Sequence, residues 1–181
     1  HALVMGGGLG LGDIQAVVEQ LSLTKGVNEI TVVAGRNEAL YENLKVMRKK
    51  LELPLKVYGY TTKIPKLMRQ ASILFTKPGG LTCREAAALG LPMVFYHAIP
   101  GQEECNAEVF ERMNCARRIR DIASLKTETE ALLAHPEILQ EMSDAAVAWS
   151  EDGAANIGIM INRLLAEQQE ERTAKLQSET I

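Results

Sequence analysis

The sequence has few cysteine, aromatic and aspartate residues. Its three cysteines, Cys83, Cys105 and Cys115, are odd in number and form no C-x-x-C pair. We therefore expect neither a disulfide framework nor a zinc site, and a reducing cytoplasm is the default location. The sequence contains four aspartates and no Asp-x-Asp pair that would hold a metal-bound diphosphate. A net charge of −3 also gives no sign of a nucleic-acid partner.

Long apolar runs and a secretory signal pattern are missing as well. No run reaches the roughly 18 residues that a membrane-spanning helix requires. Hydrophobic residues make up 46% of the 181 residues and charged residues 24%, with only 14 glycines and 6 prolines. This composition excludes a disordered or collagen-like chain and predicts one folded domain with a sizeable core.

Short apolar runs alternate with amphipathic segments along most of the chain. The runs predict parallel strands at Ala2–Met5, Ile30–Ala34, Leu55–Tyr58, Ile73–Thr76, Pro92–Tyr96 and Cys115–Ile119. Helices are predicted after Asp13 and Asn37, at Ile64–Gln70 and Thr82–Leu89, near Glu103–Met113, from Pro136 and from Asp152. This alternation predicts an α/β fold, a doubly wound, Rossmann-like parallel sheet.

The domain organisation follows from the two ends of the sequence. Residues 1–166 are predicted to form the folded domain, and residues 167–181 a polar helix extension or tail. The chain starts almost inside a strand, at His1, and enters a glycine-rich loop at once. We therefore expect it to be one domain cut from a longer protein.

The glycine-rich loop Gly6–Gly12 follows the first strand and could admit a phosphate to a helix start. A dinucleotide fingerprint needs Gly or Ala at its last position, and the possible frames place Leu11, Asp13 or Gln15 there. The acidic residue expected after the second strand is replaced by Arg36-Asn37. A phosphate site and a tight turn that serves only packing both remain open for this loop.

The second loop, Lys77-Pro-Gly-Gly-Leu-Thr-Cys-Arg-Glu85, follows the fourth strand. Its glycines would leave the N–H groups of Gly80, Leu81 and Thr82 facing a crevice, as a diphosphate cradle at a helix start. Glu85, one turn further, is placed to accept hydrogen bonds from a ribose. The alternative is a capping box formed by Thr82 and Glu85 without any ligand.

The third loop runs from His97 to Asn106 and turns at Pro100-Gly101. The side chains of Gln102, Glu103 and Asn106 are of the types that bind sugar hydroxyls. A polar helix start without a ligand is the alternative, and His97 is more simply structural.

Five motifs in this order resemble the C-terminal half of family 28 glycosyltransferases. They are Gly6-Gly-Gly, Ala34-Gly-Arg-Asn37, Tyr58-Gly-Tyr60, Thr76-Lys-Pro-Gly-Gly-Leu-Thr82 with Glu85, and Pro100-Gly-Gln-Glu103. The Lys-Pro-Gly-Gly and Pro-Gly-Gln-Glu motifs favour the monogalactosyldiacylglycerol synthases and processive diacylglycerol glucosyltransferases over the peptidoglycan N-acetylglucosaminyltransferase. The resemblance covers about residues 2 to 165.

The resemblance implies the C-terminal, donor-binding half of a two-domain GT-B enzyme. The residues that it implies for nucleotide binding are Gly8, Arg36, Gly59, Tyr60, Ile64, Gly79, Gly80, Leu81, Thr82 and Glu85; those for the sugar are Gln102, Glu103 and Asn106. It implies no catalytic residue and no metal ligand in this chain, since the general base and the acceptor site would belong to an N-terminal domain. Where Gly8 stands, the resemblance implies a serine in relatives, so any phosphate contact in this chain would come from the backbone.

The resemblance further implies an inverting, metal-independent transfer of a hexose from a UDP-sugar to a lipid acceptor, diacylglycerol in the first instance. No cofactor is expected, and the full-length protein would act as a peripheral enzyme at the cytoplasmic membrane face. The charge of the leaving group would be met by helix ends and backbone amides. Three alternative hypotheses are half of a sugar-nucleotide epimerase, a binding module without catalytic activity, and an NADP-dependent reductase. In the reductase, Arg36 would bind the 2′-phosphate of NADP.

Overall fold

The structure, a computed structural model, describes residues 1–10, 12–150 and 159–163. The chain divides into two units, His1–Ser150 and Glu151–Ile181, of which the first carries the fold. In the second unit, residues 159–163 are helical. The predicted start of the last helix at Asp152, the boundary at residue 166 and the predicted polar segment 167–181 lie outside the described residues.

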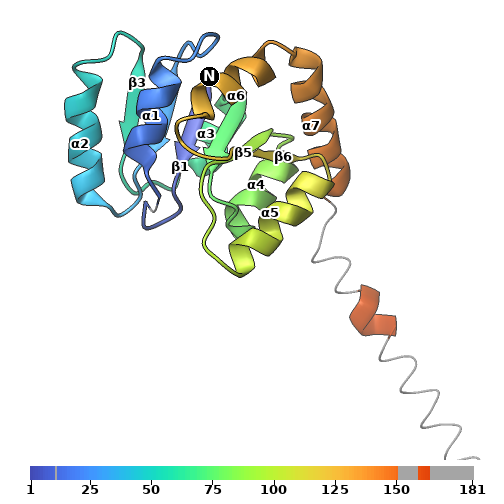
Figure 1. Cartoon of the computed structure of the whole chain (residues 1–181). Helices are drawn as coiled ribbons and strands as arrows, with labels where there is room; N and C mark the ends of the chain where they lie inside the picture. The colour runs from blue at the N-terminus through green and yellow to red at the C-terminus, as the bar shows by residue number, and fades with distance from the viewer. Residues whose placement is uncertain (11, 151–158, 164–181) are drawn as a thin grey trace, which may run out of the picture. The chain divides into compact units, whose positions relative to one another are not determined.

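Six parallel strands form one sheet in the order β3-β2-β1-β4-β5-β6 (Figure 1). Their bounds are β1 Ala2–Met5, β2 Ile30–Val33, β3 Leu55–Tyr58, β4 Ile73–Thr76, β5 Met93–Phe95 and β6 Ala116–Arg118. The register places Met5 opposite Val33 on one side and opposite Thr76 on the other. The chain runs outward from β1 in both directions, so the order reverses between β1 and β4, at the centre of the sheet.

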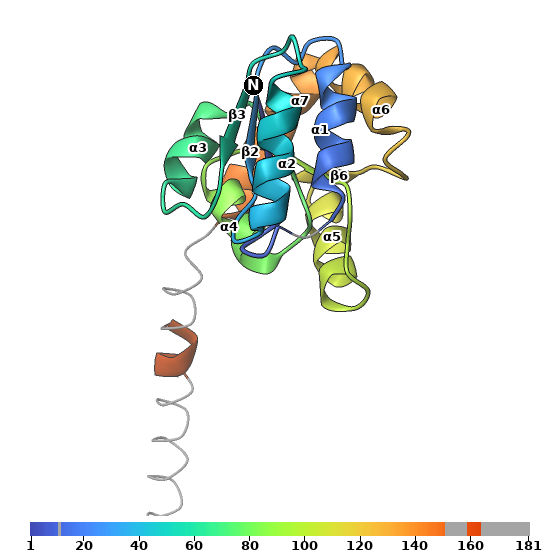
Figure 2. The same cartoon turned by 90° about the vertical axis from the view of Figure 1, so that its left-hand side faces the viewer.

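Seven helices of the first unit connect and cover the strands. Their bounds are α1 Ile14–Ser22, α2 Glu38–Arg48, α3 Ile64–Gln70, α4 Gly80–Ala88, α5 Gln102–Arg112, α6 Leu125–Leu133 and α7 Pro136–Trp149. Helices α1, α2 and α6 contribute to the core on one face of the sheet, while α3, α4 and α5 contribute to the core on the other. Figure 2 shows α1 and α2 side by side on their face.

The strand residues divide between two apolar cores by alternation. Val4 and Phe75 belong to the core under α1 and α2, whereas Leu3 and Leu74 belong to the core under α3, α4 and α5. Burial on both faces explains why the strands read as continuous apolar runs rather than as alternating patterns. The predicted doubly wound α/β fold is therefore confirmed.

The structure refines the sequence analysis at one element and corrects it at another. The sequence predicts a helical pattern after Ile119 but gives no bounds for helix α6, which buries only Leu125 and Thr129. Helix α4 begins at Gly80, two residues before the predicted start at Thr82. Thr82 therefore lies inside the first turn, and the capping-box interpretation of Thr82 and Glu85 is wrong, because the N-cap position belongs to Gly79.

Candidate functional site at the carboxyl ends of the strands

The loops after β1 and β4 meet where the strand order reverses. In doubly wound sheets, ligands bind in the crevice outside the strand ends at this point. A cleft of about 400 Å³ lies there, lined by Gly6, Gly7, Gly8, Leu9, Arg36, Tyr60 and Lys77. Loops that follow four different strands therefore contribute to one cleft.

The loop after β1 is locked against the turn after β2 by backbone contacts. Gly10 has a φ of 58°, and a Cβ there would lie 2.3 Å from the carbonyl oxygen of Ala34, so only glycine fits. The amide of Arg36 donates to the carbonyl of Gly8 at 2.9 Å. Gly8 itself is exposed and a Cβ at that position would meet no atom within 4 Å. The loop is fixed in shape but has room for a ligand at Gly8.

One wall of the cleft is formed by an arginine–tyrosine pair. The guanidinium carbon of Arg36 lies 5.0 Å from the centre of the Tyr60 ring, a cation–π distance. Tyr60 remains 64% exposed. Gly59 precedes it, half-buried, and Ile64 begins α3 and packs against the core. The predicted uracil-binding stretch thus borders the cleft through Tyr60, while Ile64 has a packing role.

The start of α4 has no side-chain cap. Its N-cap residue, Gly79, has no side chain to offer to the amides of the first turn, which are those of Gly80, Leu81 and Thr82. Leu81 is 78% exposed and Glu85 is also exposed, one turn further along the helix. These amides and the helix dipole create a partial positive charge beside the cleft, which suits an anion.

Helix α5 begins against the Lys77–Gly80 segment. Gly101 has a φ of 97°, which turns the chain into the helix, and its amide donates to Glu104 at 3.3 Å. The side-chain amide of Asn106 donates to the carbonyl of Pro78 at 3.0 Å. Gln102 is exposed beside it. The structure therefore brings the predicted sugar-binding residues next to the predicted diphosphate cradle.

A partly buried ion pair joins the same two loops. The ammonium of Lys77 donates to Oε1 of Glu103, and the amide of Ile99 donates to Oε2 at 3.0 Å. Burial alone would raise the pKa of the Glu103 carboxyl, but these two hydrogen bonds outweigh burial, and the pKa is lowered. Glu103 is therefore ionised at neutral pH.

Two residues of this region were not predicted as site residues. Lys77 was read only as the first residue of its motif, although a lysine at the end of a central strand is a signal for an anion site. Tyr96 is buried below the first loop, where its hydroxyl donates to the carbonyl of Met5 at 3.2 Å. Burial raises the pKa of Tyr96, so it remains neutral and supports the floor of the cleft.

The described residues contain neither a metal-ligand cluster nor a membrane-spanning helix. Across residues 1–10, 12–150 and 159–163, no group of three or more His, Cys, Asp or Glu side chains could hold a metal ion. In the same part of the chain, no helix is long and apolar enough to cross a membrane.

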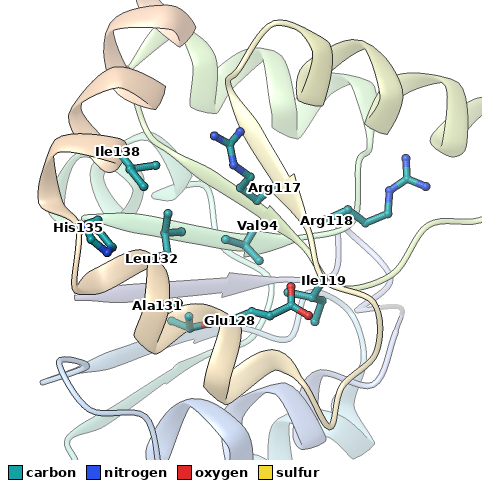
Figure 3. Close-up of a pocket in the computed structure, with 10 residues that line it drawn as sticks. Val94, Arg117, Arg118, Ile119, Glu128, Ala131, Leu132, His135 and Ile138 are labelled. Atoms are coloured by element: carbon teal, nitrogen blue, oxygen red, sulfur yellow. The ribbon is translucent and has the colours of Figure 1, made fainter.

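A second cavity, of about 380 Å³, lies between β6, α6 and the start of α7 (Figure 3). Val94, Ile119, Leu132 and Ile138 give it a mainly aliphatic wall, with charged side chains such as Arg117 and Glu128 around it. The Thr129 hydroxyl is buried beside it and has no hydrogen-bond partner among the described residues. None of the predicted site residues lines this cavity.

Comparison with known proteins gives a consistent family match. The sequence matches the model described as "Glycosyltransferase family 28 C-terminal domain" over residues 1–157. A processive diacylglycerol beta-glucosyltransferase of Bacillus cereus strain B4264 is 40% identical over 144 residues, which are 79% of this chain and 37% of that protein. The corresponding protein of strain AH187 is 44% identical over 117 residues, 65% of this chain and 30% of the relative. The chain thus spans about a third of the length of these relatives.

Two solved structures have a similar fold. The crystal structure of MurG from Acinetobacter baumannii superimposes with a TM-score of 0.72 at 20% identity, covering 89% of this chain and 48% of that one. Anabaena Alr3699/HepE, solved in complex with UDP-glucose, gives a TM-score of 0.67 at 18% identity, covering 94% of this chain and 48% of that one. At such identities the likeness concerns the fold.

Proposed function

The chain belongs to the glycosyltransferase family 28 C-terminal domain family, and from this premise we propose that it binds the nucleotide-sugar donor of a hexosyltransferase, a UDP-hexose. The observation that carries the proposal is the bare start of α4 beside the cleft between β1 and β4. A diphosphate bound there would accept hydrogen bonds from the amides of Gly80, Leu81 and Thr82. Gly79 and Gly80 allow the phosphate to approach the backbone closely.

The remaining nucleotide contacts follow from the neighbouring loops. Glu85, one turn into α4, would accept hydrogen bonds from the ribose hydroxyls, since its carboxylate is exposed on the same helix. The uracil would lie at Gly59 and Tyr60, with Ile64 beneath and Arg36 stacked on the Tyr60 ring. Gly8, which faces open space, would contact a phosphate through its backbone.

The hexose would lie against the start of α5. Gln102 is exposed there and free to turn toward a sugar hydroxyl. Asn106 already donates to the carbonyl of Pro78, and Glu103 already accepts from the ammonium of Lys77. A carboxylate oxygen has more than one lone-pair direction, so Glu103 retains capacity for a hydroxyl donor. This arrangement supports a sugar site made from Gln102, Glu103 and Asn106.

For the whole protein we propose an inverting transfer of hexose to a lipid, with diacylglycerol as the acceptor, in keeping with the names of the Bacillus relatives. The acceptor hydroxyl attacks the anomeric carbon, the bond to the UDP oxygen breaks, and a base takes the hydroxyl proton. That base and the acceptor site would be supplied by an N-terminal domain, outside this chain. The negative charge on departing UDP is met by the α4 start, without a metal or other cofactor.

The same proposal places the full-length enzyme at the cytoplasmic face of a membrane, as a peripheral protein. Its acceptor is a lipid, so the surface that touches the membrane would belong to the acceptor-binding domain. Donor binding and acceptor binding are then divided between two halves of one enzyme.

Isothermal titration of the 181-residue chain with UDP, UDP-glucose, UDP-galactose and NADPH tests the donor site. We expect the uridine nucleotides to bind and NADPH to compete poorly, because no frame of Gly6–Gly12 completes the dinucleotide fingerprint. Binding of NADPH without binding of UDP would overturn the proposal in favour of a reductase. Conversion of UDP-N-acetylglucosamine by the full-length protein without an acceptor would favour an epimerase.

A further inference from the structure

Lys77 is part of the wall of the cleft. It follows β4 directly and lines the cleft together with Gly6, Gly7 and Gly8. Its side chain is only 15% exposed. A Cβ on Gly7 would lie 3.3 Å from Lys77 Cε, so the lysine stem runs along the backbone of the first loop. The ammonium is therefore held where the loops after β1 and β4 meet.

Glu103 holds this ammonium from the opposite side. Its side chain is 13% exposed, and its second carboxylate oxygen accepts from the Ile99 amide. Lysine has three N–H donors, and the contact with Glu103 Oε1 uses one of them. Two donors of Lys77 therefore remain for a ligand in the cleft.

Among the described residues, the two other lysine–glutamate pairs, Lys45–Glu42 and Lys56–Glu29, are more exposed. Lys45 and Glu42, 2.9 Å apart, have side chains that are 40% and 55% exposed, and they lie on the surface of α2. A surface pair of this kind contributes little to the stability of the fold. Burying a pair costs desolvation free energy, and the attraction between the two charges offsets that cost poorly. A partly buried cation with unused donors is instead suited to binding an anion in the cleft.

We propose that Lys77 contacts the second phosphate of the bound nucleoside diphosphate and that Glu103 is the positioning residue that aims it. The inference rests on the donor site proposed above and extends it. The charge of the leaving group is met by one side-chain cation in addition to the backbone amides of α4. Glu103 then acts on the donor mainly through Lys77.

The test compares UDP with UMP, which lacks the second phosphate. Affinities of both are measured for the unaltered chain, Lys77→Met, Lys77→Arg and the surface control Lys45→Met. We expect Lys77→Met to weaken UDP at least about tenfold while UMP changes by less than about twofold, so that the preference for UDP collapses. Lys77→Arg keeps the charge and is expected to retain most of the preference for UDP over UMP. Lys45→Met is expected to retain all of this preference.

The outcomes separate the two proposals. If the unaltered chain binds no UDP, the donor site fails and the inference fails with it. If UDP binds and Lys77→Met keeps the preference for UDP over UMP, the inference alone is overturned. Equal losses of UDP and UMP would also overturn it, because they indicate a structural role.

A second measurement covers the case in which Lys77→Met does not fold. In the unaltered chain, with ¹⁵N-labelled lysine, the side-chain resonance of Lys77 is followed during titrations with UDP and with UMP. A shift that is clearly larger with UDP supports the contact with the second phosphate. An unchanged resonance at saturating UDP would overturn it.

Discussion

The helix starts at this edge of the sheet are of two kinds. Helices α1 and α2 are capped by their own chain, since Asp13 accepts from the Ala16 amide at 3.2 Å and Asn37 from the Leu40 amide at 3.0 Å. Helix α4 begins at Gly79 without a side-chain cap. A glycine in place of a capping side chain lowers stability by only about a few tenths of a kcal/mol, so the start of α4 is left open at a small cost in stability. Helix α3 also starts without a side-chain cap, so the missing cap leaves the α4 amides available to a ligand, and the ligand itself is part of the proposal.

Supplying the missing cap should have the largest effect on binding. In Gly79→Ser the new Cβ has room, because the nearest atom would be Glu103 Oε1 at 4.0 Å. The serine oxygen would accept from the first-turn amides and compete with the diphosphate. We expect UDP affinity to fall about tenfold or more, while the free energy of unfolding rises by a few tenths of a kcal/mol. Calorimetry measures the UDP affinity and urea unfolding measures the free energy of unfolding. An unchanged UDP affinity would contradict diphosphate binding at the start of α4.

Removing the proposed ribose contact should have a smaller effect. Glu85→Ala is expected to weaken UDP about fivefold, with an unchanged melting temperature, because Glu85 does not belong to a helix cap. Glu108→Ala, an exposed glutamate on α5, is the matched control and should leave UDP affinity unchanged. A loss of stability without a loss of affinity would count against the ribose contact.

Removing a true cap should affect stability rather than binding. Asp13→Ala deprives the Ala16 amide of its partner at the start of α1. We expect a loss of about 1 kcal/mol in the free energy of unfolding and UDP affinity within twofold of the unaltered chain. Chemical denaturation and a UDP titration on the same variant provide the readout. A variant that loses UDP binding at full stability would break the distinction between the two kinds of helix start.

The smallest expected effect is the acid dependence of the Lys77–Glu103 pair. The pKa of Glu103 is lowered in the folded protein by Lys77 and the Ile99 amide, so its contribution to stability is present above the unfolded value, about 4.3. This contribution is lost as the pH falls through the lower folded value. The gap between the melting temperatures of the unaltered chain and Glu103→Gln should therefore narrow as the pH falls below the unfolded value. A gap that stays constant between pH 7 and pH 3 would contradict this.

The fold could be predicted from the sequence in most of its parts. The apolar runs and the caps Asp13 and Asn37 are local signals, and they placed strands β1, β3 and β4 and the starts of α1 and α2 correctly. The bounds of helix α6 were not predicted because tertiary contacts, not its sequence period, decide its burial. The start of α4 was placed too late because a glycine N-cap gives no side-chain signal.

The site could be predicted as a set of loops, but not in its internal contacts. The glycines after β1 and Lys77 after β4 line one cleft, whereas no residue of the third predicted loop, from His97 to Asn106, lines it. The pairing of Lys77 with Glu103 joins residues 26 positions apart, and no local pattern specifies such a contact. The roles of the individual residues remain predictions.

One measurement tests the central claim most directly: the amide spectrum of the ¹⁵N-labelled chain during a titration with UDP. The account predicts that the amides of Gly80, Leu81 and Thr82 shift most, with smaller shifts at Gly8 and Tyr60. Shifts confined to the second cavity, at Val94, Ile119 and Leu132, or no shifts at saturating UDP, would contradict it.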